Sequence, residues 1–183
     1  MNILDCHWLE GVLRVESPYF DSRNDDTDIS LLVVHNISLP PGQFGGPYIE
    51  QLFTGTLNPN EHPFFAQIHQ HRVSAHCLIR RDGQVIQFVP FNARAWHAGV
   101  SQFAGRERCN DYSIGIEMEG TDFIGYTEEQ YRSLSALTLS LMQRYPQITP
   151  QRVTGHQYIA PGRKTDPGLS FDWSKLFTLI GPK

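Results

Sequence analysis

The sequence predicts an α/β fold in which helices pack on a mixed central β-sheet of about five or six strands. Three stretches carry this prediction. Residues 30–36, SLLVVHN, have the apolar run of a buried strand, residues 73–90 have the pattern of a β-hairpin, and residues 127–146 have the apolar spacing of an amphipathic helix. Because strand and helix patterns are interspersed along the chain, we expect a single α/β domain over residues 1–183.

Composition and charge narrow the class of protein. The chain is 40% hydrophobic and 19% charged, and its length is enough to bury one sizeable core. A net charge of −4 argues against a nucleic-acid partner, which normally requires a basic surface. We see no basic and apolar segment typical of a secretion signal, and the longest apolar run, Leu31–Val34, is too short to cross a bilayer. Three widely separated cysteines make a poor disulfide framework, so we expect a cytoplasmic protein.

The first strong element is the strand at 30–36, which we expect to be buried on both faces and to end at His35. Residues 36–65 follow and are rich in proline, glycine and asparagine. Their one helical candidate is Pro47–Phe53, where proline occupies a favourable first-turn position. So long a weakly structured stretch in a compact domain predicts a lid, a cleft wall or a functional loop.

Two further strand patterns lie in the middle of the chain. VSAHCLI and QVIQFVP flank RRDG at 80–83, and Asp-Gly supplies the backbone angles of a tight hairpin turn. YSIGIEME at 112–119 alternates, with Ile114, Ile116 and Met118 on one face. The opposite face of this strand is polar and carries Glu117 and Glu119. These glutamates either line a solvated face or place one carboxylate in a cavity for proton transfer.

Two helices are expected in the second half. In 127–146, Thr127 and Gln130 fit a capping box, apolar residues recur at helical spacing, and Pro146 ends the pattern. A second helix is predicted at Asp172–Ile180, with Gly181 just beyond it.

The segment GHQYIAPGRKTDPG at 155–168 carries His156, Lys164 and Asp166 among glycines and prolines that disfavour regular structure. A catalytic zinc takes three protein ligands and keeps one position open, and two histidines with one carboxylate form such a set. His35 at the end of the strand at 30–36 and His156 after RVTG are candidates, because α/β sheets place sites at strand ends. Each residue also has a plainer interpretation: an edge histidine, a surface lysine, or a turn aspartate before proline.

Two other clusters offer alternatives. HPFFAQIHQHRVSAH contains His69 and His71 two residues apart, flanked by His62 and His76, and is a competing metal site without a well-spaced carboxylate. ARAWHAGVS is a predicted loop whose Trp96 is either a core plug or a stacking surface for a sugar ring or peptide.

Longer motifs cover nearly the whole chain: LLVVHNISLPPGQFGGPYI, LFTGTLNPNEHPFF, RVSAHCLIRRDGQVIQFVPF, AWHAGVS, GRERCNDYSIGIEMEGTD, VTGH and IAPGRKTDPGLSFDW. Together they resemble the type-2 family of zinc-dependent N-acetylmuramoyl-L-alanine amidases, and most of all its branch that acts on 1,6-anhydro-muropeptides. The resemblance implies the mixed-sheet fold of that family, which is also the fold of peptidoglycan-recognition domains. Some relatives have a cysteine as the third zinc ligand, whereas this sequence has Asp166 in the matching segment.

The resemblance also implies roles for individual residues. It makes His35, His156 and Asp166 the Zn²⁺ ligands, Glu117 the general base, and Lys164, with the zinc, the stabiliser of the oxyanion. Zinc lowers the pKa of a bound water to about 7, which would make hydroxide available near neutral pH. Further positions match residues near the substrate of the family: Asn36 and Trp96 for the muramoyl portion, and Arg72 and Arg108 for peptide carboxylates. Both arginines could equally be solvated surface charges.

By the same resemblance, the substrate is a small anhydro-muropeptide, cut between the lactyl group of the muramic acid and L-alanine during cytosolic peptidoglycan recycling. No membrane, nucleic acid or obligate protein partner is expected. Two rival functions stay open: a muropeptide-binding or sensing domain on the same fold, and a zinc peptidase that cuts within the stem peptide. Related binding domains lose a metal ligand, and the presence of all three candidates favours an enzyme.

Overall fold

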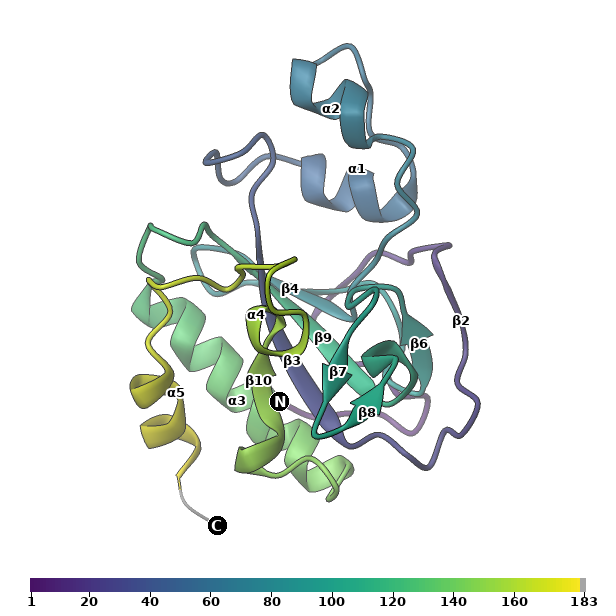
Figure 1. Ribbon diagram of the computed structural model, residues 1–183, viewed down its shortest axis with the longest axis vertical. Coiled ribbons are helices and arrows are strands. Elements are labelled where there is room, and N and C mark those ends of the chain that lie inside the picture. Colours follow the sequence, from purple (N-terminus) through teal and green to yellow (C-terminus); the bar gives the residue numbers. More distant parts are fainter. Residues whose placement is uncertain (182–183) are drawn as a thin grey trace.

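The apolar run Leu31–Val34 begins an interior strand, β3 (Leu31–Ile37), of a six-stranded sheet (Figure 1). The computed structural model describes residues 1–181. The strand order is β1-β5-β4-β9-β3-β10, with bounds Leu13–Arg14, Val85–Gln87, Cys77–Ile79, Ser113–Glu119, Leu31–Ile37 and Val153–Gly155. β9 and β10 pair in parallel with β3, whereas β4 and β5 form the antiparallel hairpin that Asp82-Gly83 predicts. The expected α/β class with a mixed sheet is confirmed.

β3 is two residues longer than expected. Its pairing with β9 continues past His35 to the register partners Ile37 and Glu119, so the strand does not end at the histidine. His35 is the register partner of Glu117, and partners on neighbouring parallel strands project to the same face. The side chains of His35 and Glu117 therefore lie next to each other on one face of the sheet.

The opposite face of the sheet packs against α3 (Glu128–Arg144) and α5 (Trp173–Ile180). Thr127 and Gln130 form the predicted capping box at the start of α3, and the Asp172 side chain caps α5. Leu32 and Val34 of β3 share a continuous core with the apolar stripe of α3, whose members include Leu134, Leu137 and Leu141. Burial of this stripe holds α3 against one face of the sheet, and the functional site lies on the other face, which bears His35 and Glu117.

The face that bears His35 and Glu117 is covered at the β4–β5 end by α1 (Tyr48–Thr54) and α2 (Pro63–Ile68). The α1 helix follows the prediction within one residue, but α2 was not expected, and the description of 36–65 as having one helix is wrong. His62 caps α2 with its ring nitrogen, and Pro63 occupies the first turn of the helix. The helix was not predicted because the surrounding residues, NPNEHP, have the composition of a loop. Both helices are packed, because buried Phe53 and Phe65 join Leu78 and Ile86 in one core cluster.

Short elements complete the chain. β2 (Phe20–Ser22) pairs with β6 (Ala93–Ala95), and β7 (Gln102–Phe103) pairs with β8 (Arg106–Glu107). The short helices are η1 (Cys109–Asp111), η2 (Pro150–Arg152) and α4 (His156–Ile159). The β6–η1 region and α4 cover the lower part of the site face around Leu31 and Val33. Among residues 1–181, no helix is long and apolar enough to span a bilayer.

Candidate metal centre

His35 enters the site from β3, and His156 enters from the start of α4. β10 lies beside β3 with Gly155 opposite Val34, so the chain delivers His156 next to His35. A side chain at 155 would meet Pro167 Cδ at 2.8 Å, which is why glycine is required at this close approach. Both histidines are buried, with exposures of 1% and 2%.

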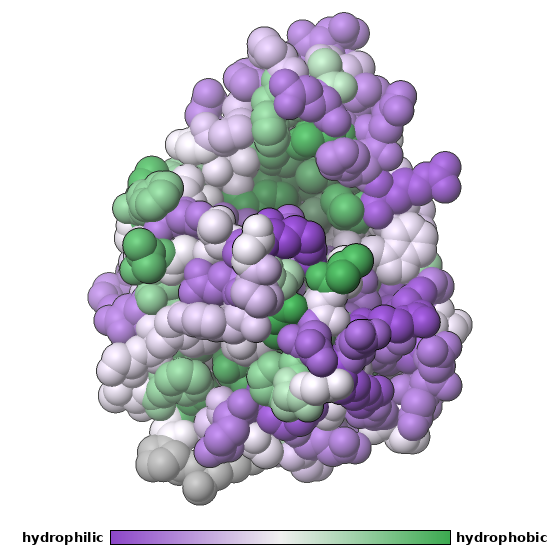
Figure 2. Space-filling model, in the orientation of Figure 1, coloured by the Kyte–Doolittle hydropathy of each residue, from purple (hydrophilic) through white to green (hydrophobic). Residues whose placement is uncertain are grey.

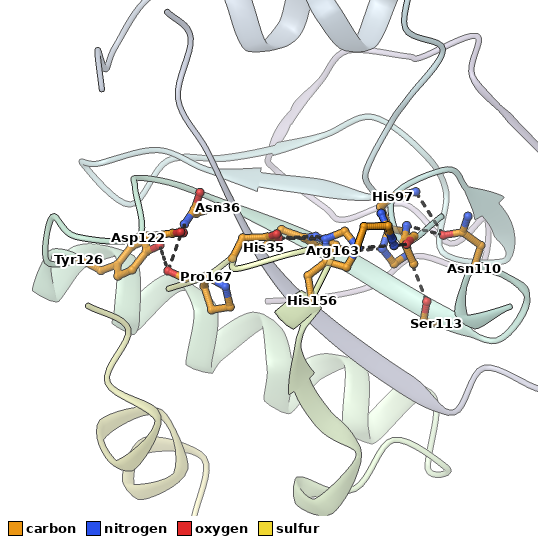
Figure 3. Close-up of polar contacts among 12 residues, drawn as sticks. His35, Asn36, His97, Asn110, Ser113, Asp122, Tyr126, His156, Arg163 and Pro167 are labelled. Atoms are coloured by element: carbon orange, nitrogen blue, oxygen red, sulfur yellow. Dashed lines mark hydrogen bonds and ion pairs between the residues drawn. The ribbon is translucent and has the colours of Figure 1, made fainter. Parts of the chain in front are cut away.

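Asp166 reaches the same point from the loop that follows α4. Its backbone carbonyl accepts a hydrogen bond from the Gln157 amide at 2.8 Å, which folds the loop back over the helix. The carbonyl of Pro167 accepts hydrogen bonds from the side chains of Asn36 at 3.1 Å and Tyr126 at 2.8 Å (Figure 3). These contacts fix the loop on the edge of the sheet, so the glycines and prolines of 155–168 shape a loop that presents a carboxylate.

The three candidate ligands converge. Nδ1 of His35 lies 3.0 Å from Nδ1 of His156, and Asp166 Oδ2 lies 3.0 Å from each of these nitrogens. A tetrahedral zinc with bonds of about 2.0–2.1 Å would separate its donors by about 3.3–3.4 Å, so the triangle has nearly the right size. Within residues 1–181, this is the group of three that could hold a metal ion.

The hydrogen bonds of His156 supply an independent reason for a cation. Its Nε2 lies 3.0 Å from the Ala98 carbonyl, which can only accept, so Nε2 carries the proton. In the neutral imidazole, Nδ1 then has a lone pair, and it points at a carboxylate oxygen. Two acceptors at this distance need a proton or a metal ion between them, and the donor set of two imidazoles and one carboxylate fits zinc.

The electrostatics of the site favour a neutral His35 beside an ionised Asp166. Burial lowers the pKa of His35 to about 4, against the opposing effect of Asp166. For Asp166, burial opposes ionisation, but hydrogen bonding with His156 and His35 outweighs it and holds the pKa of the carboxyl below its usual range. A metal ion requires these same protonation states in its ligands.

Glu117 and Lys164 flank the cluster. Glu117 is half-buried, and among the described residues its Oε2 has no hydrogen-bond partner although the atom is buried. Burial, with the charge of Asp166 as a second cause, raises the pKa of Glu117 well above its ordinary value. Lys164 is exposed and lines an open cleft beside Asp166, together with Asn36, Ser38, Pro41, Gly42, Thr121, Asp122, Phe123, Arg163 and Thr165. Neither glutamate of β9 lies on a solvated face, since Glu119 is also buried.

Figure 2 shows a hollow in the molecular surface between the α1–α2 segment and the loops below it, with apolar surface at its floor. A second cleft lies on the other side of Arg163 and is lined by Gly99, Val100, Ser101, Gln102, Glu107, Arg108, Ile159, Ala160, Pro161 and Arg163. The candidate metal cluster therefore has accessible surface next to its open side, although its histidines are buried.

The four residues predicted to contact substrate are dispersed around this region. Asn36 lines the first cleft, but its amide already donates to Asp122 at 2.8 Å as well as to the Pro167 carbonyl. Arg108 lines the second cleft and forms an ion pair with Asp111 at 3.1 Å. Trp96 is half-buried and stacks on Tyr19, with ring centroids 6.3 Å apart. Arg72 is exposed. Their contact with substrate stays a prediction.

The competing histidine cluster does not assemble in the described residues. His62 caps α2, and His69 bonds with the backbone carbonyls of its own turn. His76 is buried, where its Nδ1 accepts from the Gly115 amide and its Nε2 lies 3.1 Å from the Ala93 carbonyl. These side chains therefore have separate local roles.

One residue of the site was missed by sequence reasoning. Nδ1 of His97 lies 2.8 Å from Nε2 of His35 (Figure 3), whereas Asp166 contacts the other ring nitrogen of His35, Nδ1. The loop around Trp96 was predicted to be functional or structural, but no contact between the neighbouring His97 and a candidate ligand was predicted. The signal that could have found it is Gly115, a glycine inside a strand, which indicates close approach by another group.

The fold and the cluster define a class of protein, and the comparison with known families agrees. The chain belongs to the N-acetylmuramoyl-L-alanine amidase family, whose model matches residues 25–169. Within that family, it is similar to the 1,6-anhydro-N-acetylmuramyl-L-alanine amidase AmpD of Citrobacter freundii. The two are 62% identical over 180 residues, which cover 98% of this chain and 96% of the relative. The resemblance found in the sequence is confirmed.

Solved structures give the same result. A crystal structure of an AmpD derivative matches with a TM-score of 0.94 and 62% identity, covering 97% of this chain and 99% of that one. The amidase AmiD from Escherichia coli, in complex with anhydro-N-acetylmuramic acid-L-Ala-D-gamma-Glu-L-Lys as its substrate, matches with a TM-score of 0.64. It is 28% identical, and the match covers 85% of this chain and 59% of AmiD. The expected amidase fold is confirmed.

Proposed function

We propose that residues 1–183 act as one zinc-dependent amidase domain that hydrolyses the amide between the lactyl group of 1,6-anhydro-N-acetylmuramic acid and L-alanine. One observation carries the proposal: His35 Nδ1, His156 Nδ1 and Asp166 Oδ2 lie 3.0 Å from one another. The names of the relatives support the choice of bond, and the substrate bound to AmiD supports the class of ligand.

Each residue of the site has a separate chemical role. Zinc held by His35, His156 and Asp166 would act as a Lewis acid for the carbonyl and would acidify water. Glu117 takes a proton from the attacking water as its oxygen bonds to the carbonyl carbon. When the C–N bond breaks, the same carboxyl delivers that proton to the departing nitrogen of L-alanine. Burial raises the pKa of this carboxyl, which favours the protonated form that the second transfer needs.

Lys164 stabilises the negative charge that grows on the carbonyl oxygen. Its ammonium group is near enough to oppose protonation of His35 and to favour ionisation of Glu117, so its charge acts on the centre of the site. The group approaches from the exposed side of the loop, where a substrate carbonyl would enter.

We expect Lys164→Ala to lower kcat/KM by about 100- to 1000-fold, the usual cost of losing one oxyanion contact. Zinc content should stay at the wild-type level, because the lysine donates no ligand atom. Lys175→Ala is the matched control, since Lys175 pairs with Glu128 on the opposite face and should leave the rate unchanged. Steady-state kinetics with zinc analysis test this, and a near-normal rate in Lys164→Ala would remove the residue from the mechanism.

The flanking residues position the two ends of the substrate. Asn36 and Trp96 would contact the muramoyl portion, and Arg72 and Arg108 would offer guanidinium groups to peptide carboxylates. A soluble anhydro-muropeptide is a product of wall breakdown, so this activity fits cytosolic peptidoglycan recycling.

Metal analysis and product identification test the function together. We expect purified protein to contain about one zinc per chain, to lose activity on dialysis against a chelator and to regain it with zinc. Mass spectrometry with a defined anhydro-muropeptide should detect the free sugar and the intact stem peptide. A shortened peptide would instead indicate a peptidase, and binding without cleavage would indicate a recognition domain.

A further inference from the structure

The outer nitrogens of both histidine ligands meet one short segment, His97–Ala98. Nε2 of His35 lies 2.8 Å from Nδ1 of His97, and Nε2 of His156 lies 3.0 Å from the carbonyl oxygen of Ala98 (Figure 3). The two imidazoles come from different elements, β3 and α4. A single two-residue segment therefore contacts both of them on the side away from Asp166.

This segment is held firmly. The Oδ1 of Asn110 accepts hydrogen bonds from the amides of His97 at 3.2 Å and Ala98 at 2.8 Å. The ring of His97 rests directly on Gly115 of β9, where any Cβ atom would overlap it. Its Nε2 lies 3.1 Å from Oγ of Ser113, two residues earlier on the same face. The position of the ring is thus set by a strand, not by a mobile loop.

Proton positions follow from the donors that are fixed. If Nδ1 of His35 is to bind a metal, its proton must lie on Nε2, where it is donated to His97. His97 must then accept with Nδ1 and carry its own proton on Nε2, which donates to the Ser113 hydroxyl. A histidine at position 97 can meet both requirements. A side chain with only an amino group, or an apolar ring, could not accept a hydrogen bond from His35.

We infer that His97 is a positioning residue that fixes the ring orientation and tautomer of His35, so that its Nδ1 faces the metal. Ala98 does the same for His156 through its carbonyl. This inference rests on the proposed function, and it deepens it by assigning an outer layer to the metal centre. Most metal-binding histidines donate their second N–H to a carboxylate, carbonyl or water, so a neutral imidazole in this role is distinctive.

The test compares zinc affinity in variants of the full chain, measured by competition with a chromophoric chelator. His97→Phe keeps a ring but removes the acceptor, and we expect it to weaken zinc binding by about 10- to 100-fold. His97→Asn can place Oδ1 near the position of Nδ1 and should recover most of the affinity. Ser113→Ala is the matched control: it removes the contact to the far nitrogen of His97 and should change affinity far less than His97→Phe.

The outcomes separate this inference from the proposed function. Wild-type affinity in a folded His97→Phe chain would overturn the inference alone, because the wild type would still bind zinc. A wild-type chain that binds no zinc would overturn both. Equal losses in His97→Phe and His97→Asn would also contradict a role for the acceptor.

A second measurement decides the question if His97→Phe does not fold. Nitrogen chemical shifts of the zinc-loaded wild type report which ring nitrogen of each histidine carries a proton. We expect His97 to be protonated at Nε2 and unprotonated at Nδ1, with His35 protonated at Nε2. A proton on Nδ1 of His97 would overturn the inference.

Discussion

Asp166→Asn should abolish tight zinc binding and, with it, turnover. The substitution keeps the size of the side chain and removes the negative charge that both imidazoles face at 3.0 Å. An amide oxygen is a weaker zinc ligand than a carboxylate, and the preferred catalytic sets use the charged group. The Lewis-acid contribution is several kcal/mol, so we expect kcat/KM to fall by about a thousandfold or more.

Thermal unfolding gives a readout of Asp166→Asn that is independent of turnover. A ligand that binds only the folded state stabilises it, by about 2.7 kcal/mol at a free concentration of 100 times its Kd. Zinc should therefore raise the Tm of the wild type but leave that of Asp166→Asn nearly unchanged. Asp122→Asn is the matched control, because Asp122 lines the same cleft and should keep the zinc response. A full zinc-dependent rise in Asp166→Asn would exclude Asp166 as a ligand.

The parts of the fold that could be predicted are those that depend on residues close together in the sequence. The capping box of α3 and the hairpin turn at Asp82-Gly83 each depend on residues a few positions apart, and both were predicted correctly, while the helix predicted at Asp172–Ile180 matches α5 within one residue. The α2 helix has only Pro63–Ile68, and its cap is a histidine instead of a serine, threonine or aspartate. A helix this short has too few turns for apolar spacing to identify it.

The candidate metal centre could not be assembled from local sequence patterns. His35 is 121 residues from His156 and 131 from Asp166, so no spacing rule could join them, and the family resemblance supplied the set. His97 entered the site only through packing, because β9 places Gly115 under its ring. Substrate contacts by Arg72 or Arg108 depend on a bound ligand, and neither the sequence nor the free chain determines them.

Glu117→Gln should keep zinc and lose most of the rate. The amide has nearly the same shape but cannot take a proton from water or return one to the leaving nitrogen. General acid–base catalysis contributes about 100- to 10,000-fold, and Glu117 serves both steps, so we expect a loss toward the upper part of that range in kcat. Glu119→Gln is the matched control from the same face of β9. Glu119 accepts from the amides of Gly45 and Arg81 and should affect stability more than rate.

The raised pKa of Glu117 should also lower the stability of the zinc-free protein at neutral pH. A carboxyl whose pKa is higher in the folded than in the unfolded state makes folding less favourable as the pH rises above its ordinary value of 4.5. In that range the folded state binds more protons than the unfolded state, so the free energy of unfolding falls. Glu117→Gln removes this cost, and the zinc-free variant should be more stable than zinc-free wild type at neutral pH, with the advantage fading towards pH 4.5. Denaturant unfolding at several pH values measures it, and a variant less stable than wild type at neutral pH would show that the buried carboxylate is not the source of the cost.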